Sequence, residues 1–191
     1  MGCEIEKKFL VKALPEDLER FPFHEITQGY LCRHPAVRVR REVICKGAGA
    51  APRERYTMTY KGIRQEGVLS QEEYNLALTK EAYEHLLAKA DGVVIEKKRV
   101  ILPLNEDAFD EESFGEDPVL GAWYSAKGEE APRIELDIFG GVHQGLMFAE
   151  VEFPSEETAA AYHAASWFGE EVTGDEHYSN AWLAENGPEK A

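Results

Sequence analysis

The sequence lacks any long apolar segment, since nowhere do about 18 apolar residues follow one another as in a membrane-crossing helix. Its N-terminus also lacks the apolar stretch of a signal peptide, because charged residues begin at Glu4. No two of its three cysteines, Cys3, Cys32 and Cys45, have the C-x-x-C spacing of a metal or redox motif, so we expect reduced, mostly buried thiols. These absences predict a cytoplasmic protein with no membrane association.

Basic residues are also scarce. The chain has 21 Lys and Arg against 36 Asp and Glu, a formal net charge of -15. A polyanion is attracted only where cations cluster, so we expect no nucleic-acid partner and treat any phosphate site as a local exception. The 191 residues, 43% of them hydrophobic, are enough to bury one core, and we expect a single domain over 1–191.

Period-two alternation of apolar or β-branched residues, separated by Gly and Pro, predicts a mostly β (α+β) fold of the barrel or sandwich type. The expected strands are 2–11, 26–32, 36–45, 54–62, 68–78, 93–102, 132–140 and 146–153. Two helices are expected over 79–90 and 156–166, with Thr79 and Ser155 as N-caps. The acidic segment 105–132 predicts a long loop, for which plain solvation is favoured over a role as a lid.

Charged residues recur at i and i+2 in these strands, a spacing that places them on one face. They are Glu4, Glu6 and Lys8; Arg38 and Arg40; Lys97 and Arg99; Glu135 and Asp137; Glu150 and Glu152; and, on two further strands, Lys61 and Glu73. A sandwich also places charges on its outer face, so each pair alone fits a solvated surface. Several strands carry charges of one sign only, however, which a random solvated face would not do.

If these faces converge inside a barrel, the cations can hold an oligophosphate through charge-assisted hydrogen bonds. Clustered carboxylates fit the same site when Mg²⁺ or Mn²⁺ lies among them, because both ions prefer oxygen ligands and bridge carboxylates to phosphates. Such a metal lowers the pKa of a bound water and orients it for attack on phosphorus. We therefore expect all thirteen charged side chains to point into one enclosed tunnel.

The N-terminal run Glu4-Ile5-Glu6-Lys7-Lys8 carries an E-x-E-x-K signature and resembles the CYTH superfamily, the triphosphate tunnel metalloenzymes. Later segments are similar to family strands in the same order: Gln28-Gly29-Tyr30-Leu31, Arg38-Val39-Arg40, Thr57-Met58-Thr59-Tyr60-Lys61, Ile95-Glu96-Lys97-Lys98-Arg99, Glu135-Leu136-Asp137-Ile138-Phe139 and Glu150-Val151-Glu152-Phe153. The tail from Trp167 to Thr173, followed by Tyr178-Ser179-Asn180, agrees as well. The resemblance covers nearly the whole chain.

The resemblance implies a closed eight-stranded antiparallel β-barrel, a tunnel with a few helices packed outside, which binds a small-molecule triphosphate with Mg²⁺ or Mn²⁺. Six residues match phosphate-gripping positions: Lys8, Arg38, Arg40, Lys61, Lys97 and Arg99. Seven match acidic positions that serve metals and water: Glu4, Glu6, Glu73, Glu135, Asp137, Glu150 and Glu152. Of these residues, Glu4, Glu6 and Lys8 are the catalytic candidates. Asn75 departs from the pattern, because bacterial relatives often carry a second Glu there, and 105–132 is longer than expected.

Within this family the compact bacterial type points to an inorganic triphosphatase, acting as a monomer or homodimer. Adenylate cyclase and thiamine, nucleoside or RNA triphosphatase remain alternatives, because a fold does not fix the substrate. An organic group would need an aromatic pocket, for which Trp123, Tyr124 and Tyr178 are candidates, although such residues more often serve packing. A binding module for polyphosphate or phosphoproteins would keep the cations and lose the carboxylates. A plain acidic sandwich would have no site at all.

Overall fold

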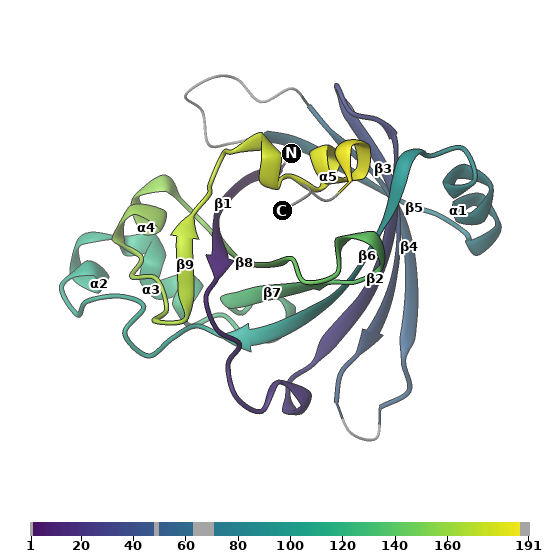
Figure 1. The fold of residues 1–191 in the computed structure, drawn as a ribbon. Coiled ribbons are helices and arrows are strands. Elements are labelled where there is room, and N and C mark those ends of the chain that lie inside the picture. Colours follow the sequence, from purple (N-terminus) through teal and green to yellow (C-terminus); the bar gives the residue numbers. More distant parts are fainter. Residues whose placement is uncertain (1, 48–49, 63–70, 188–191) are drawn as a thin grey trace.

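The structure is a computed structural model that describes residues 2–47, 50–62 and 71–187. Nine strands form one antiparallel sheet in the order β5-β4-β3-β2-β6-β7-β8-β1-β9. They are β1 (Gly2–Val11), β2 (Phe23–Cys32), β3 (Ala36–Cys45), β4 (Arg53–Lys61), β5 (Gln71–Ala77), β6 (Asp91–Pro103), β7 (Arg133–Phe139), β8 (Met147–Phe153) and β9 (Phe168–Glu171). The sheet is strongly curved (Figure 1). The strand β1, which lies next to the end strand β9, also pairs with β5 at the other end, at Gly2↔Glu73, Cys3↔Glu72 and Glu4↔Gln71.

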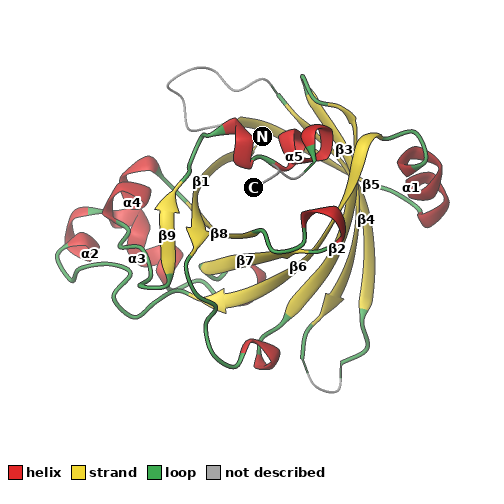
Figure 2. Cartoon of the chain, viewed as in Figure 1, coloured by secondary structure: helices red, strands yellow, loops and turns green. Residues whose placement is uncertain are grey.

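Five α-helices accompany the sheet in the described residues (Figure 2). They are α1 (Lys80–Leu87), α2 (Ser113–Glu116), α3 (Pro118–Tyr124), α4 (Glu156–Ala161) and α5 (Asn180–Asn186). The described residues also contain four short 3-10 turns: η1 (Leu18–Arg20), η2 (Gly128–Glu130), η3 (Gly141–His143) and η4 (Glu176–Tyr178). None of the helices in the described part of the chain has the length and apolar character needed to cross a membrane.

The mostly β, antiparallel prediction is confirmed, while the predicted strand number is wrong. The ninth strand, β9, pairs with β1 at Phe9↔Glu171 and Val11↔Phe168. It has four residues, too few for alternation to be recognised in the sequence. The other strands lie close to their predicted ranges. Residues 63–70 fall outside the described residues, and they include 68–70, the beginning of the strand predicted over 68–78.

The larger apolar core lies on the outer face of the sheet. Val100, Leu136 and Val151 project outward from β6, β7 and β8 and are completely buried there. They pack beneath the layer that contains α2, α3, α4 and β9 (Figure 1). The helix α1 also packs on the outer face, over the other strands β2, β3 and β4. Thr79 and Ser155 cap α1 and α4 by accepting hydrogen bonds from the backbone N–H groups of Ala82 and Thr158, as predicted.

Two predicted segments need correction. The segment 105–132 is not a solvated loop, because it contains α2, α3 and η2, and its Phe109 and Leu120 are buried in the outer core. The helix predicted over 156–166 ends at Ala161, since Tyr162 takes an extended conformation. The Tyr162 ring is buried against Phe9 and Phe153, and this packing outweighs the helical preference of the preceding alanines.

A smaller apolar core lies on the inner face, at one end of the curved sheet. It joins inward side chains of β2, β6, β7 and β8 to the last helix: Tyr30, Ile95, Phe139, Phe148, Leu183 and Ala184. The imidazole Nε2 of His143 lies 3.0 Å from the carbonyl oxygen of Leu183 and ties η3 to α5. The expectation that the helices pack outside the sheet therefore holds for α1 to α4 and fails for α5.

Candidate active site

A cavity of about 980 Å³ lies on the inner face of the sheet. Ten of the thirteen predicted charged residues line it: Glu6, Lys8, Arg38, Arg40, Lys61, Glu73, Arg99, Glu135, Glu150 and Glu152. They come from seven strands, on each of which the i, i+2 alternation turns charged side chains inward. The part of the prediction that brings the charged side chains to one cavity is therefore confirmed for these ten, and the enclosed tunnel stays a prediction. Glu4 lies in β1, and its side chain is outside the described part of the structure.

One wall of the cavity, formed by β6, β7, β8 and β1, is organised around Arg99. Its guanidinium donates to Asp137 through Nε and Nη2, both at 2.7 Å, and Nη2 also reaches Glu150 at 2.7 Å. Nη1 donates to Glu135. Burial opposes a charge at Arg99, but the carboxylates of Asp137 and Glu135 raise its pKa. The Lys8 ammonium lies 3.0 Å from Glu150, and although burial opposes ionisation, this charge and that of Arg99 hold the pKa of Glu150 well below its usual value.

Lys97 and Asp137 do not line the cavity, which corrects the expectation that all thirteen residues face it. They form an ion pair in which both side chains are fully buried. The Lys97 ammonium lies 5.3 Å from the centre of the Phe139 ring and 3.4 Å from the Asn180 amide oxygen, so the inner core and α5 cover it. Burial lowers the pKa of Lys97 to about 8. The roles assigned to these two residues stay predictions.

The facing wall carries Arg38 and Arg40 on β3. Arg40 Nε donates to the Gln28 amide oxygen at 2.9 Å, and its Nη1 lies 3.6 Å from Glu42. Burial, together with the positive charges of Arg38 and Arg99, lowers the pKa of Arg40 to about 10. Within the described part of the chain, the buried Arg38 Nε has no hydrogen-bond partner. The wall thus holds two neighbouring guanidinium groups, and that of Arg38 has a buried donor without a partner in the described residues.

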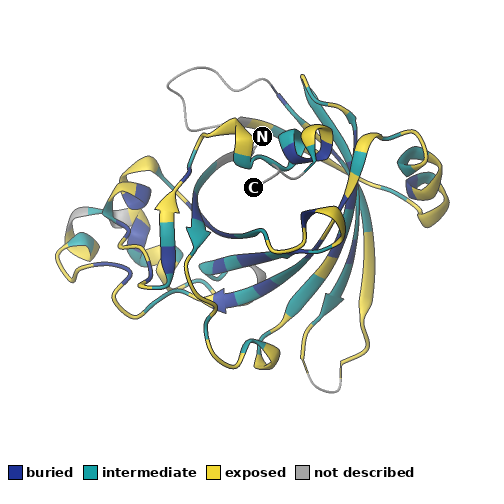
Figure 3. Ribbon diagram, viewed as in Figure 1, coloured by how far each residue is buried: buried dark blue, intermediate teal, exposed yellow. Residues whose placement is uncertain are grey.

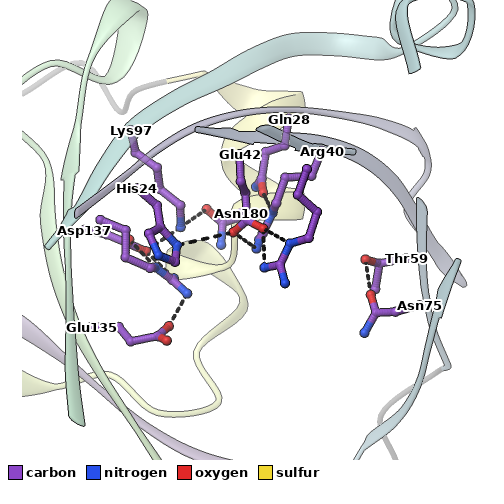
Figure 4. A network of polar contacts seen from close by, with 12 residues as sticks. His24, Gln28, Arg40, Glu42, Thr59, Asn75, Lys97, Glu135, Asp137 and Asn180 are labelled. Carbon is purple, nitrogen blue, oxygen red and sulfur yellow. Dashed lines mark hydrogen bonds and ion pairs between the residues drawn. The ribbon is translucent and has the colours of Figure 1, made fainter. Parts of the chain in front are cut away.

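Glu42 is a cavity residue that the sequence analysis missed. It follows Arg38 and Arg40 on the same face of β3, so this strand does not carry charges of one sign only. Its carboxylate binds Arg55 Nε at 2.8 Å and lies 3.8 Å from the His24 ring (Figure 4). Burial opposes ionisation, but hydrogen bonding with His24 and the charge of Arg40 hold its pKa far below the usual value. Continuing the i, i+2 count by one step would have found it.

On β4 and β5, the residues of the wall are linked by hydrogen bonds. The Lys61 ammonium lies 2.8 Å from Glu73 Oε2, and the Asn75 amide nitrogen donates to Glu73 Oε1 at 2.7 Å. The Thr59 hydroxyl donates to the Asn75 amide oxygen at 2.7 Å. Burial would raise the pKa of Glu73, but the charge of Lys61 and hydrogen bonds from Lys61 and Asn75 lower it to about 2. Thr59 could not be found from the charge pattern, because its hydroxyl is neutral.

Carboxylates suited to a metal meet where β1 and β8 pair. Glu6 lies directly opposite Glu152, and both line the cavity. Within the described ranges, no three His, Cys, Asp or Glu side chains are arranged to hold a metal ion by themselves. A pair of carboxylates still fits Mg²⁺ or Mn²⁺, since Mg²⁺ in phosphate-transfer sites usually takes one or two carboxylates and completes its coordination with substrate oxygens and water. The donor chemistry is therefore suitable when a phosphate is present.

The aromatic candidates for an organic subsite serve packing in this structure. Trp123 and Tyr124 pack edge-on against Phe109 in the outer core, and Tyr178 packs edge-on against Phe148 in the inner core. Trp123 also lines a separate cavity of about 110 Å³ beside Glu135 and Glu152. At the end of the main cavity closed by α5, the Tyr178 carbonyl oxygen lies 3.3 Å from the Lys8 ammonium.

No family model matches the sequence. The chain is 34% identical over 182 residues to the inorganic triphosphatase of Nitrosomonas europaea, a match that covers 95% of this chain and 96% of that protein. It belongs to the inorganic triphosphatase family. The resemblance to the triphosphate tunnel metalloenzymes is thereby confirmed.

Two further comparisons agree with this family membership. The crystal structure of the inorganic triphosphatase NE1496 has 30% sequence identity and a TM-score of 0.59, and the match covers 98% of both chains. A 52-residue segment is 44% identical to the inorganic triphosphatase of Acetivibrio thermocellus and covers 27% of this chain and 32% of that protein. The charged cavity is therefore the candidate active site of a family member.

Proposed function

We propose that this triphosphatase-family protein hydrolyses inorganic triphosphate to pyrophosphate and phosphate in the charged cavity, with Mg²⁺ or Mn²⁺. Family membership supports the reaction class, because the Nitrosomonas europaea relative, matched over nearly its whole length, is named an inorganic triphosphatase. An inorganic substrate also agrees with the packing roles of Trp123, Tyr124 and Tyr178, none of which forms a built aromatic slot beside the cations.

The observation that carries the proposal is the unsatisfied hydrogen-bond donor of Arg38. Its buried Nε has no hydrogen-bond partner in the described residues, although buried donors are nearly always satisfied. Arg40 lies next to it on the same face, and the two positive charges repel. An anion with several oxygens would satisfy both guanidinium groups at once, because guanidinium matches phosphate in a bidentate geometry. A linear triphosphate offers such oxygens along the wall from Arg40 to Lys61.

The same proposal includes a closed tunnel made by β1 to β8. It is supported by the pairing of β1 with β5, which joins the two sides of the curved sheet. A tunnel would enclose the phosphate chain between the two walls, and enclosure strengthens electrostatic contacts by excluding water. The strand β9 would then lie outside the ring, attached to β1.

For the reaction, Glu6 and Glu152 are the proposed metal ligands, and the bound ion would supply charge neutralisation and a water of lowered pKa. Arg38, Arg40 and Lys61 would position the phosphate chain. Water oxygen forms a bond to the terminal phosphorus while the bridging P–O bond breaks, and pyrophosphate leaves. Lys8 remains positively charged, because Glu150 raises its pKa despite burial, and would stabilise negative charge that develops on the phosphate oxygens.

A phosphate-release panel tests the proposal. Tripolyphosphate, pyrophosphate, ATP and thiamine triphosphate are supplied with Mg²⁺, with Mn²⁺ and with EDTA. We expect rapid metal-dependent cleavage of tripolyphosphate and slower cleavage of ATP. An Arg38→Met/Glu152→Gln protein prepared in the same way controls for contaminating phosphatases. Cyclic AMP and pyrophosphate as the main products from ATP would favour the cyclase alternative, and binding without cleavage would favour the polyphosphate-binding module.

A further inference from the structure

Two neutral and two charged side chains on two paired strands are linked by two hydrogen bonds and one ion pair into one continuous series of contacts. In β4 and β5, Thr59 pairs with Asn75 and Lys61 pairs with Glu73. The side chains of all four line the cavity. This chain of side-chain contacts runs from Thr59 to Asn75 at 2.7 Å, from Asn75 to Glu73 at 2.7 Å, and from Glu73 to Lys61 at 2.8 Å. Figure 4 shows the Thr59 and Asn75 end of it, apart from the cluster around Arg40 and Glu42.

The chemistry of these groups fixes the direction of every bond. Ionised Glu73 can only accept, so the Asn75 amide must turn its nitrogen towards Glu73 and its oxygen towards Thr59. The Thr59 hydroxyl then has to donate, and Thr59 is held in place because it is 2% exposed. A reversed amide would place two acceptors face to face at Glu73. The orientation of the Glu73 carboxylate is therefore set from the buried end of the chain.

Lys61, the last residue in this chain of side-chain contacts, is a predicted phosphate ligand. Lysine has a flexible four-carbon side chain, and fixing it on binding costs conformational entropy. A carboxylate that is itself fixed restricts the Lys61 ammonium before any substrate arrives. Part of the conformational entropy of Lys61 is therefore already lost in the substrate-free protein. An ammonium carries three N–H donors, so the ion pair with Glu73 does not by itself prevent contact with a phosphate oxygen.

We propose that Thr59 and Asn75 are positioning residues, which hold Glu73 as the fixed counter-ion of Lys61 and so place Lys61 for the phosphate chain. Glu73 then serves substrate binding as the partner of Lys61, and the metal lies at the β1 and β8 side of the cavity. This inference rests on the proposed function for the identity of the ligand. It assigns a use to Asn75, where the family resemblance implied a carboxylate.

The test uses three substitutions in the full-length protein. Thr59→Val keeps the shape and removes the hydroxyl, whereas Thr59→Ser keeps the hydroxyl and is the matched control. Asn75→Asp keeps the shape and places a second carboxylate against Glu73. We expect Thr59→Val and Asn75→Asp to raise KM for tripolyphosphate by about tenfold, the order expected when one hydrogen bond is lost and one long side chain must be ordered on binding. In both variants kcat should stay within about twofold of wild type, and Thr59→Ser should have a KM close to wild type.

Calorimetric titration of each protein with tripolyphosphate in EDTA provides a readout independent of metal and of turnover, and Kd should rise in parallel with KM. Melting temperatures check that every variant is folded. Wild-type KM and Kd in Thr59→Val would overturn the inference, as would equal losses in Thr59→Ser and Thr59→Val, or a loss confined to kcat. The wild-type protein could also bind tripolyphosphate without cleaving it, with the expected differences in Kd among the variants. That result would contradict the proposed function and still support the positioning role.

Discussion

The Lys97 ammonium and the Asp137 carboxylate form an ion pair behind the cavity wall, with neither side chain exposed to solvent. Arg99 binds the same carboxylate from the cavity side, with Nε and Nη2 both at 2.7 Å. Asp137 therefore links a buried lysine to the arginine that organises the wall. The stability of the fold and the geometry of the site are coupled through this one carboxylate.

We expect Lys97→Met to destabilise the protein by about 3 kcal/mol, because removing one partner leaves a buried charge without full compensation. Lys7→Met is the control, since Lys7 makes a more exposed pair with Glu171 at 3.5 Å, and loss of such a pair costs about 1 kcal/mol or less. Urea denaturation at neutral pH measures both. Equal effects of the two substitutions would contradict the buried position of Lys97.

The Glu42 cluster predicts a pH dependence of stability. The folded pKa of Glu42 lies below its ordinary value of 4.5, owing to His24, Arg40 and Arg55 acting against burial. Its contribution is therefore complete above pH 4.5 and is lost as the pH falls through the folded value. Glu42→Gln should cost about 2 kcal/mol at pH 7, and the difference from wild type should shrink steadily in acid. Denaturation curves from pH 7 to pH 3 would show it, and a difference that is constant with pH would argue against this assignment.

Arg38→Met should weaken tripolyphosphate binding by about tenfold or more, since each lost charge-assisted contact is worth about 1.5–3 kcal/mol. The empty variant should be as stable as wild type, because the change also removes repulsion with Arg40. Arg41→Met is the matched control on the same strand, as Arg41 faces outward and binds Glu54 at 2.5 Å. Comparable losses of affinity in both variants would mean that the overall charge of the protein, and not the cavity, governs binding.

Glu152→Gln should raise the Mg²⁺ or Mn²⁺ concentration needed for half-maximal activity by about tenfold and lower kcat, because it removes a proposed metal ligand. Glu25→Gln is the control, since Glu25 is exposed on β2 and does not line the cavity. Manganese binding followed by electron paramagnetic resonance, in the presence of a non-hydrolysed triphosphate analogue, gives a readout without turnover. Unchanged manganese affinity in Glu152→Gln would remove Glu152 from the ligand set.

A non-hydrolysed triphosphate analogue with Mg²⁺ should raise Tm by about 5–10 °C, because a ligand at about 100 times its Kd adds roughly 2.7 kcal/mol. Metal alone should do less, since no phosphate would complete its coordination and repulsion among the carboxylates would persist. Thermal scans of the free protein, with metal, with analogue and with both would measure these shifts. An equal shift with sulfate would indicate a general anion patch.

The strands and the inward charges could be predicted because alternation is a local property: Arg38 and Arg40 must share a face whatever their neighbours are. The interaction partners of the inward charges could not be predicted. Arg99, for example, meets Glu150 only after β6, β7 and β8 are placed side by side. For the same reason the sequence could not show that Lys97 would lie behind Arg99, under α5.

Charged residues dominate the composition of the segment 105–132 and predict a loop, whereas its fold depends on a few apolar residues. Phe109, Leu120 and Trp123 anchor it to the outer core. Phe109 precedes the short helix α2, and the other two lie in α3. Helices of four and seven residues show too little periodicity to be recognised from the pattern alone.

The two sides of the sheet differ in how they are covered. The strands β6, β7 and β8 are backed by the large outer core, whereas the outward residues Tyr60, Tyr74 and Leu76 of β4 and β5 remain exposed (Figure 3). Substitutions on β4 and β5 therefore disturb little of the packing that stabilises the fold. Thr57, which also lines the cavity from β4, can be exchanged at lower cost in folding than the buried Thr59. This wall is where the cavity lining can be changed with the least disturbance of the large core, and where an engineer would begin a redesign.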